Sequence, residues 1–541
     1  MTGRTAFVVA LLLATLPAPS QESHHGSARN ERLGTVAFAT SCSAAAQPTF
    51  NRAVALLHSF EFGRSIEAFK GVLAADPSCA MAEWGIALNQ WSNPFAPGLK
   101  SSAQIQAGLE AIRRAHTLGA ATDRERGFID AAAKLYEDAE HVPQQTRVIA
   151  YRDAMAALAA RSADDDEAAI FHALAIAIAA NPSDKSYGEL LKAGAILERL
   201  FAKRHDHPGL AHYIIHAYDV PPLADRALEA ARQYAAIAPA APHALHMPSH
   251  TFTRAGFWQE SIDTNIKSAA SARRDGAIGE ELHASDYQVY AYLQTGQDRA
   301  ARRVVDALPE MARRYDPTVI TGAAPPAAAY FAIAAIPARY ALERGAWREA
   351  VALEPRATNF PFTEAITHFA RAIGAARLGQ PDVIRASMEA LLRIRDRLTT
   401  AGEPYWAEQV DVQRRVAAAW LAFAEGRKAD AVTEMRTAAD REDATEKSAV
   451  TPGPLAPARE MLGELLLETG AAADALREFD ATLRKEPNRF RAVAGAARAA
   501  AAAGDRRTAA TYYARLVTIC ARADRPGRAE LIEARRHTTR R

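Results

Sequence analysis

The sequence predicts an all-α fold built from repeated pairs of antiparallel helices, and three observations lead to this class. Alanine is abundant, aromatic residues make up only 7% of the chain, and strand-like runs of Val, Ile and Thr are scarce. Such a composition favours helices over strands. Glycine recurs at turn positions, and near the C-terminus one pattern of small, aromatic and turn residues returns after 34 residues. A chain of 541 residues can bury a large core in such an array.

The clearest copies of the repeat lie in residues 456–520. The first copy carries, in order, Leu462, Gly463, Leu466, Gly470, Ala475, Phe479 and Pro487. A shift of 34 residues gives Ala496, Ala497, Ala500, Gly504, Ala509 and Tyr513. This is the tetratricopeptide pattern of two antiparallel helices per repeat. Small residues let the two helices approach closely, the aromatic residue fills the space against the next pair, and the proline cannot continue the second helix. The sequence therefore predicts a tetratricopeptide-repeat-like superhelical array.

Weaker copies of the pattern extend over the rest of the chain. Phe69 and Pro77 occupy the aromatic and proline positions of an early copy. Later glycine turns occur at Gly256, Gly296, Gly345, Gly379 and Gly426. Irregular spacing between the copies indicates inserted loops. We expect a helical array over 49–310, middle repeats over 311–455 and the tandem repeats over 456–520.

The two ends of the chain predict export and a solvated tail. Residues 1–20 carry one early cation, Arg4, an apolar run from about Ala6 to Leu16, and small residues at Ala18 and Ser20 that suit a signal-peptidase site. The run is short for a permanent membrane anchor. We therefore expect a signal peptide cleaved near Ser20, a periplasmic or secreted protein, and no stable membrane insertion. Residues 21–48 are expected to be extended, and the basic residues 521–541 to form a solvated, frayed tail.

The net charge indicates which classes of partner the protein can attract, and the cysteines indicate whether a disulfide can form. The formal net charge is +2, from 65 Lys plus Arg against 63 Asp plus Glu, so electrostatics give no case for a nucleic-acid partner. Cys42 and Cys79 flank the first predicted helix pair, and export would permit a disulfide between them. The alternative is that each is a small buried hydrophobic residue. Cys520 would be left over.

Histidines gather in one part of the chain. Five of the sixteen lie in fewer than forty residues, and a sixth follows; these six are His212, His216, His243, His246, His250 and His283. His212 and His216 are four residues apart, so on a helix they share one face, which is the spacing of helical metal ligands. We place Asp219 on the same face. His205 and His207 are expected to be surface turn residues.

The positions of the later histidines follow from helix signals. Proline inside the stretch HMPSH suits the first turn of a helix, so we expect His250 inside a helix and His246 on the loop before it. His283 and Asp286 lie three residues apart on one face of the next first helix. Because the first helices of consecutive repeats lie side by side, we expect His216, His250 and His283 to converge.

Two interpretations of these histidines stay open at this point. In the first, the residues line a groove that binds a protein, a peptide or a small ligand, or they pack and pair with neighbours. That set comprises His212, His216, Asp219, His243, His246, His250, His283 and Asp286. In the second, the ligands of a divalent transition metal such as zinc, copper or iron are His212, His216, His246, His250 and His283.

Signatures of known catalytic sites are missing from the sequence. The stretch HYIIH lacks the glutamate of the HExxH protease motif, and neither a GxSxG elbow, a phosphate-binding glycine loop nor a CxxCH haem motif occurs. A metal-dependent enzyme with His246 or His283 as general base has no specific support. We expect a binding scaffold rather than an enzyme.

Several motifs stand in a defined order: SCSAAAQPTFNRAVALLHSFEF, GLAHYIIHAYD, APAAPHALHMPSHTFTRAGFWQESIDTN and TPGPLAPAREMLGELLLETG. This order, from about Gly34 to Val517, resembles a family of exported bacterial tetratricopeptide-repeat proteins. The family's histidine motifs match at the six histidines named above and at His58. Its members often read DATEKHPVTPGP, where this chain has Ser448 and Ala449. The family has no established biochemical activity, so the resemblance implies the fold and export alone.

Overall fold

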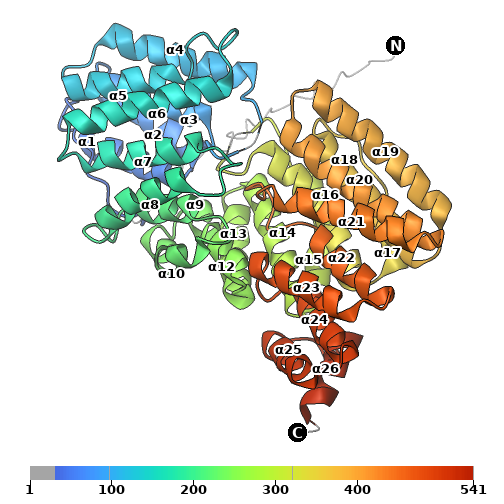
Figure 1. The fold of residues 1–541 in the computed structure, drawn as a ribbon. Coiled ribbons are helices and arrows are strands. Elements are labelled where there is room, and N and C mark those ends of the chain that lie inside the picture. The colour runs from blue at the N-terminus through green and yellow to red at the C-terminus, as the bar shows by residue number, and fades with distance from the viewer. Residues whose placement is uncertain (1–30, 97, 320, 540–541) are drawn as a thin grey trace, which may run out of the picture. The chain divides into compact units, whose positions relative to one another are not determined.

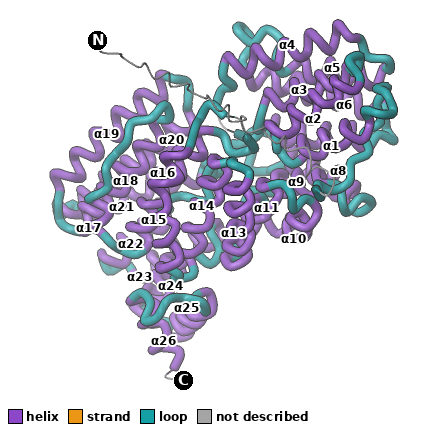
Figure 2. The backbone as a smooth tube through the Cα atoms, turned by 180° about the vertical axis from the view of Figure 1, so that it is seen from behind, coloured by secondary structure: helices purple, strands orange, loops and turns teal. Residues whose placement is uncertain are grey.

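The computed structural model describes residues 31–96, 98–319 and 321–539. Within these ranges the chain is a succession of helices, with no strand (Figures 1 and 2). No helix among the described residues is both long and apolar enough to cross a membrane. The expected signal peptide over 1–20 and the first part of the expected extended segment lie outside the described residues. Residues 31–46 contain no helix.

The N-terminal helices pack against one another in chain order. Their bounds are α1 Gln47–His58, α2 Phe62–Ala75, α3 Ala80–Trp91, α4 Ser102–Leu118, α5 Asp123–Lys134, α6 Gln144–Arg161, α7 Asp166–Ala179 and α8 Gly188–Phe201. Polar side chains fix several helix starts. Ser101 and Gln104 form a capping box at α4, and the Asp165 carboxylate accepts from the first backbone N–H groups of α7. A disulfide joins Cys42 to Cys79, whose Cα atoms are 5.0 Å apart, and encloses α1 and α2.

The central helices carry the clustered histidines and appear in green in Figure 1. They are α9 Pro208–Ala217, the short 3-10 helix η2 Ala224–Ala227, α10 Leu228–Ile237, α11 Pro242–His246, α12 Pro248–Ala255, α13 Trp258–Arg274, α14 Ile278–Gln294 and α15 Asp298–Arg314. Prolines at the N-termini of α9, α11 and α12 start these helices, as expected for a residue without a backbone N–H. The sequence stretch from 242 to 255 therefore forms two short helices in direct succession.

The C-terminal part continues the pattern of helix pairs. Its helices are α16 Pro326–Glu343, α17 Trp347–Val351, α18 Pro361–Arg377, α19 Pro381–Thr400, α20 Pro404–Ala424, α21 Lys428–Asp443, α22 Ala458–Glu468, α23 Ala472–Lys485, α24 Phe490–Ala502, α25 Arg506–Ile519 and α26 Ala529–Thr539. The turn between α22 and α23 passes through Gly470 with a φ of +87°. This left-handed conformation is open to glycine at little cost.

Close packing within a pair explains the repeat pattern. A Cβ atom at Gly463 on α22 would lie 2.9 Å from the ring of Phe479, and one at Gly495 on α24 would overlap the same ring. Phe479 is fully buried, so its ring fills the space where α22, α23 and α24 meet. Gly85 on α3 stands in the same relation to Phe69 on α2. The prediction of an all-α, tetratricopeptide-repeat-like array of antiparallel helix pairs is confirmed.

The basic C-terminal segment differs from the expected frayed tail. Residues 529–539 form α26, and Leu531 and Ala534 are fully buried against the helices before it. Arg528 pairs with Asp298 at 2.5 Å. The expectation of a solvated tail is therefore wrong for this stretch, because its two apolar side chains, three residues apart, form a packing face.

Two large hydrophobic clusters and two smaller ones make up the core of the described residues, and the smallest comprises Ala372, Ala375, Ile384, Ala417 and Leu421. One large cluster runs from Leu33 to Phe252 with Ala323, the other from Ala327 to Ala534, and the larger of the two smaller clusters from Trp258 to Tyr340. Helices α9, α11 and α12 contribute apolar side chains to the first cluster and α14 to the cluster from Trp258 to Tyr340. The histidine-bearing helices thus lie where two apolar clusters meet.

Candidate metal centre

Four helices bring six histidine side chains into one buried group, here named the histidine cluster. Helix α9 supplies two of them, α11 two, α12 one and α14 one. Each side chain is at most 8% exposed, so a peptide lying on the surface would not reach them. The members of the histidine cluster are His212, His216, His243, His246, His250 and His283.

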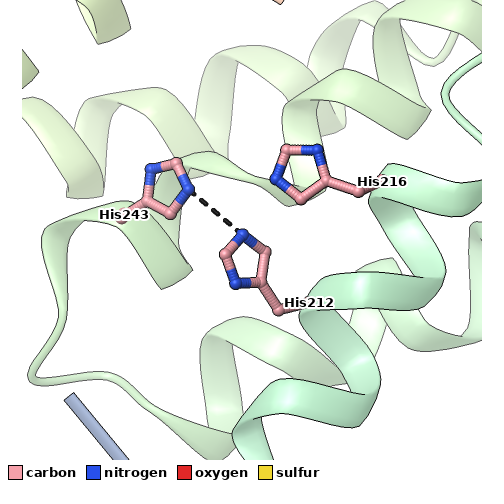
Figure 3. Close-up of side chains that lie close together, drawn as sticks. All are labelled: His212, His216 and His243. Atoms are coloured by element: carbon pink, nitrogen blue, oxygen red, sulfur yellow. Dashed lines mark hydrogen bonds between the residues drawn. The ribbon is translucent and has the colours of Figure 1, made fainter. Parts of the chain in front are cut away.

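The histidine cluster divides into two sets of three. In each set, one ring nitrogen per side chain lies within 4.8 Å of the other two. The first triad is His212, His216 and His243 (Figure 3), and the second triad is His246, His250 and His283. One pair of Nε2 atoms in each triad is 3.2 Å apart. Two imidazole nitrogens on one tetrahedral metal, at the usual metal–nitrogen length, are separated by about 3.3 Å. The observed spacing therefore matches a shared ion.

In the second triad, the hydrogen bonds at Nδ1 of His246 and His250 determine which ring nitrogen carries the proton. The Asn265 amide nitrogen donates to Ser261 O at 2.7 Å, so its Oδ1 is the atom that faces His246 Nδ1 at 2.7 Å. His250 Nδ1 lies 2.9 Å from the carboxylate of Asp219, which in its ionised form is an acceptor only. Both Nδ1 atoms must therefore carry the proton. Both Nε2 atoms then present lone pairs to each other.

Among the described residues, the Tyr287 hydroxyl is the group placed to donate a proton to this pair of nitrogens. The Tyr287 hydroxyl lies 3.2 Å from both His250 Nε2 and Thr451 O, and it has a single proton for these two acceptors. His246 Nε2 faces only the lone pair of His250, and His283 Nδ1 is buried without a partner among the described residues. Two facing lone pairs in a buried site are unfavourable unless a cation lies between them. Imidazoles held by acceptors at their other nitrogen are the usual arrangement around a bound metal.

In the first triad, hydrogen bonding fixes the proton position of only one of the two facing rings. His212 Nδ1 donates to the backbone carbonyl of His58 at 2.6 Å, which leaves its Nε2 as a lone pair directed at His243 Nε2. His216 Nε2 and His243 Nδ1 are buried without a hydrogen-bond partner among the described residues. A proton on His243 Nε2 would satisfy the pair, so this triad does not by itself demand a cation.

The electrostatics of five of the six rings favour the neutral form at pH 7. Burial, reinforced by the neighbouring imidazoles, holds the pKa values of His212, His216, His246 and His283 well below the usual value of histidine. Burial also lowers the pKa of His250 to about 4, against the opposing pull of Asp219. Neutral imidazole is the form that binds metals.

The two predicted acidic residues take different places. Helix α9 ends at Ala217, so Asp219 lies in the turn that follows rather than on the helical face of His212, contrary to the prediction. Its carboxylate bonds His250, Arg254 and Lys447. Burial would raise the pKa of Asp219, but the two cations hold it well below the usual range. Asp286 instead pairs with Arg339 at 2.9 Å and belongs to neither triad.

Three other predictions about histidines are corrected. His246 is the last residue of α11 rather than part of a loop, because Pro242 starts a helix before it. His216, His250 and His283 do converge, with ring centres of His216 and His250, and of His250 and His283, 6.3 Å apart, but His216 shares its triad with His243, which the predicted metal ligands omitted. His207 is fully buried and not a surface residue. The HALH spacing of His243 and His246, three residues apart, was the available signal for the missing ligand.

A second buried histidine group lies beside the first triad. Glu167 on α7 accepts from His58 and His207, each at 3.0 Å, and His58 also bonds the Tyr213 hydroxyl at 3.0 Å. Burial opposes the ionised form of Glu167, but the two imidazoles keep its pKa far below the usual value. We name these three residues, His58, Glu167 and His207, the glutamate clamp. The facing nitrogens of the clamp have a carboxylate as partner, so they need no metal.

Comparisons with known proteins do not identify a family or a ligand for this chain. No protein-family model matches the chain, and no curated protein matches it by sequence. Among solved structures, a human IFIT1 dimer with PPP-AAAA has 12% identity and a TM-score of 0.40, and the match covers 89% of this chain and 96% of that one. The APC/C hetero-tetramer Cut9-Hcn1 has 13% identity and a TM-score of 0.35, over 91% of this chain and 90% of that one. The P58(IPK) TPR domain has 14% identity and a TM-score of 0.21, over 66% and 95%. At these values the likenesses say nothing about ligand or partner.

Proposed function

We propose that this protein binds two transition-metal ions, one at each histidine triad. The observation that carries the proposal is the 3.2 Å distance between the Nε2 atoms of His246 and His250. Neither Nε2 carries a proton, because the Nδ1–H groups of the two rings donate to Asn265 and Asp219. A metal ion at this position turns two opposed lone pairs into two coordinate bonds.

The donor set indicates the class of metal. Each triad offers three imidazole nitrogens and neither thiolate nor carboxylate. Imidazole suits zinc, copper, iron and nickel, whereas magnesium and calcium prefer oxygen ligands. Three protein ligands leave a coordination position open, which is typical of sites that bind a further small ligand rather than purely structural sites.

The test is metal stoichiometry in purified protein without an affinity tag. Chelator-treated protein is titrated with Zn(II), Cu(I) and Cu(II) and its bound metal measured by mass spectrometry. We expect two ions per chain for the wild type, and one for the His250→Ala variant. The matched control is His205→Ala, which removes an exposed histidine outside the cluster. A folded wild type that retains no metal would overturn the proposal.

Protein binding is a second candidate function, and it rests on a different surface. A groove of about 870 Å³ is lined by the connections between α3 and α4 and between α15 and α16. Leu99 and Val319 line it and are 75% and 58% exposed, which is unusual for large apolar side chains. We expect Leu99→Asp or Val319→Asp to weaken capture of a partner, while His250→Ala leaves capture unchanged. Equal capture by all variants would contradict this assignment.

Export to the periplasm or the medium is also a proposal, supported by the N-terminal residues Arg4 to Ser20. The mass of the protein isolated from its native compartment tests it. We expect a chain that lacks about the first twenty residues, and a full-length mass would contradict export by this route.

A further inference from the structure

The two triads are neighbours. The ring centres of His216 and His250 are 6.3 Å apart, and those of His243 and His246 are 6.1 Å apart. Within the second triad the ring centres of His250 and His283 are also 6.3 Å apart. The gap between triads is thus no larger than a gap inside one. Two ions bound here would be neighbours, as two-metal sites that share one small bridging ligand require.

The charges around the cluster favour ions of low charge. Asp219 is already paired with two cations, Arg254 and Lys447. Beyond His243 lie the buried carboxyl groups of Glu61 and Glu280. The Glu61 carboxyl is itself paired with the Arg64 guanidinium at 3.6 Å. Two divalent ions would bring four positive charges into this enclosed site, and two monovalent ions would bring half as many. Of the metals that imidazole suits, copper is the one with a stable monovalent state.

Aromatic side chains enclose the first triad. Phe60 has a φ of +55°, a costly conformation for phenylalanine. Its ring lies 4.4 Å from that of His212 and is stacked 5.7 Å from that of His243. Phe95 stacks on His216 at 4.0 Å. Phe60 also lines a cavity whose other walls are mostly leucine and aromatic side chains. A ligand that reaches the metals from this side meets apolar surface, which favours a small uncharged molecule.

We propose that the histidine cluster holds a pair of Cu(I) ions that bind dioxygen between them. This inference rests on the proposed function. Each Cu(I) gives one electron and becomes Cu(II), and dioxygen accepts both electrons and becomes a bridging peroxide. Two or more Cu–O bonds form, the O–O bond order falls from two to one, and no proton or further reductant is required. The reverse transfer of two electrons releases dioxygen. The Tyr287 hydroxyl lies 3.2 Å from His250 Nε2, one of the proposed ligand atoms.

The experiment loads wild-type protein with Cu(I) under anaerobic conditions and then adds dioxygen. At two equivalents of copper we expect uptake of one dioxygen per two copper ions and no Cu(II) signal in electron paramagnetic resonance, because the two spins couple through the bridge. At one equivalent we expect much less uptake. This comparison needs no substitution, so it does not depend on the folding of a variant. His250→Gln, which keeps much of the side-chain volume, should bind one copper and lose the uptake, whereas His205→Ala should retain both properties.

The outcomes separate this inference from the proposed function. Two Cu(I) ions bound to a folded chain without dioxygen uptake would overturn the inference and leave metal binding intact. Two independent Cu(II) signals of full intensity after exposure to air would do the same. A protein that binds zinc but no copper would also overturn the inference, and a protein that binds neither metal would overturn both proposals.

Discussion

The part of the chain that the structure describes contains two buried histidine groups that differ in how their protons are accommodated. In the glutamate clamp, the Glu167 carboxylate lies 3.0 Å from a ring nitrogen of each histidine, so every short contact joins a donor to an acceptor. In the second triad, the Nδ1–H groups of His246 and His250 donate to Asn265 and Asp219. The two Nε2 atoms therefore carry no proton and direct lone pairs at each other. Burial and crowding of histidines are common to both groups. The difference shows that the placement of protons, rather than the number of imidazoles, identifies a candidate metal site.

Lowering the pH should have the largest effect on the histidine cluster. The pKa of His250 is about 4 in the folded state, below the value of about 6.5 in an unfolded chain. The unfolded state therefore binds more protons as the pH falls. The stability from His250 is fully present above about pH 6.5 and is lost toward pH 4, a change of about 3 kcal/mol. The other cluster histidines with lowered pKa values add losses of the same sign.

This pH dependence is measured by urea denaturation of metal-free protein between pH 7.5 and 4.5. A matched series with saturating zinc should keep its stability to lower pH, because bound metal excludes the proton. Identical curves with and without metal would contradict the distinction between the two histidine groups.

Removing the carboxylate of the glutamate clamp should be the next largest effect. Glu167→Ala leaves His58 and His207 buried without their acceptor, and we expect a loss of about 3–5 kcal/mol in unfolding free energy. The folded fraction should still bind two metal ions. The control is Glu67→Ala, which removes an exposed ion pair with Lys70 and should change stability by less than about 1 kcal/mol. Loss of both metals in folded Glu167→Ala protein would show that the clamp belongs to the metal site.

A smaller effect is expected from removing the Asn265 side chain, which accepts the hydrogen bond of the proposed ligand His246. Asn265→Ala frees His246 Nδ1 and should weaken metal binding at the second triad by about 10–100-fold. Binding at the first triad should not change, since His212 is oriented by the His58 carbonyl. Calorimetric titration that resolves two binding steps provides the measurement. An equal loss at both steps would mean that the two triads are not separately organised.

The smallest effect is expected from His205→Ala. This side chain is exposed and belongs to neither group. We expect a change in unfolding free energy within about 0.5 kcal/mol and unchanged metal stoichiometry. A large loss of metal in this variant would indicate adventitious surface binding and would remove the contrast between the two groups.

The fold was open to prediction because its signals are local. Gly463, Phe479 and Pro487 lie within one repeat, and each has a direct role in packing or in ending a helix. The pairing of His212 with His216 is local as well, because both lie on one helix. The grouping of His216 with His243 depends on how α9 meets the short helix α11, and sequence spacing contains no measure of that.

The groups that fix the protons were harder to anticipate from sequence. Glu167 lies 109 residues from His58, and Asp219 lies 31 residues from His250. Asn265 resembles any polar residue on a helix until its amide is seen bonded to Ser261 on one side and His246 on the other. Such partners come together only when the helix pairs stack, so periodicity does not reveal them.

The hydrogen bond from His212 to the carbonyl of His58 has a consequence for how the two triads can change in evolution. A main-chain carbonyl is present whatever side chain occupies that position, so few single substitutions can remove this support. The second triad depends on the side chains of Asn265 and Asp219, either of which one codon change can replace. Selection acting on metal affinity would therefore tune the second triad first, while the first triad stays nearly constant.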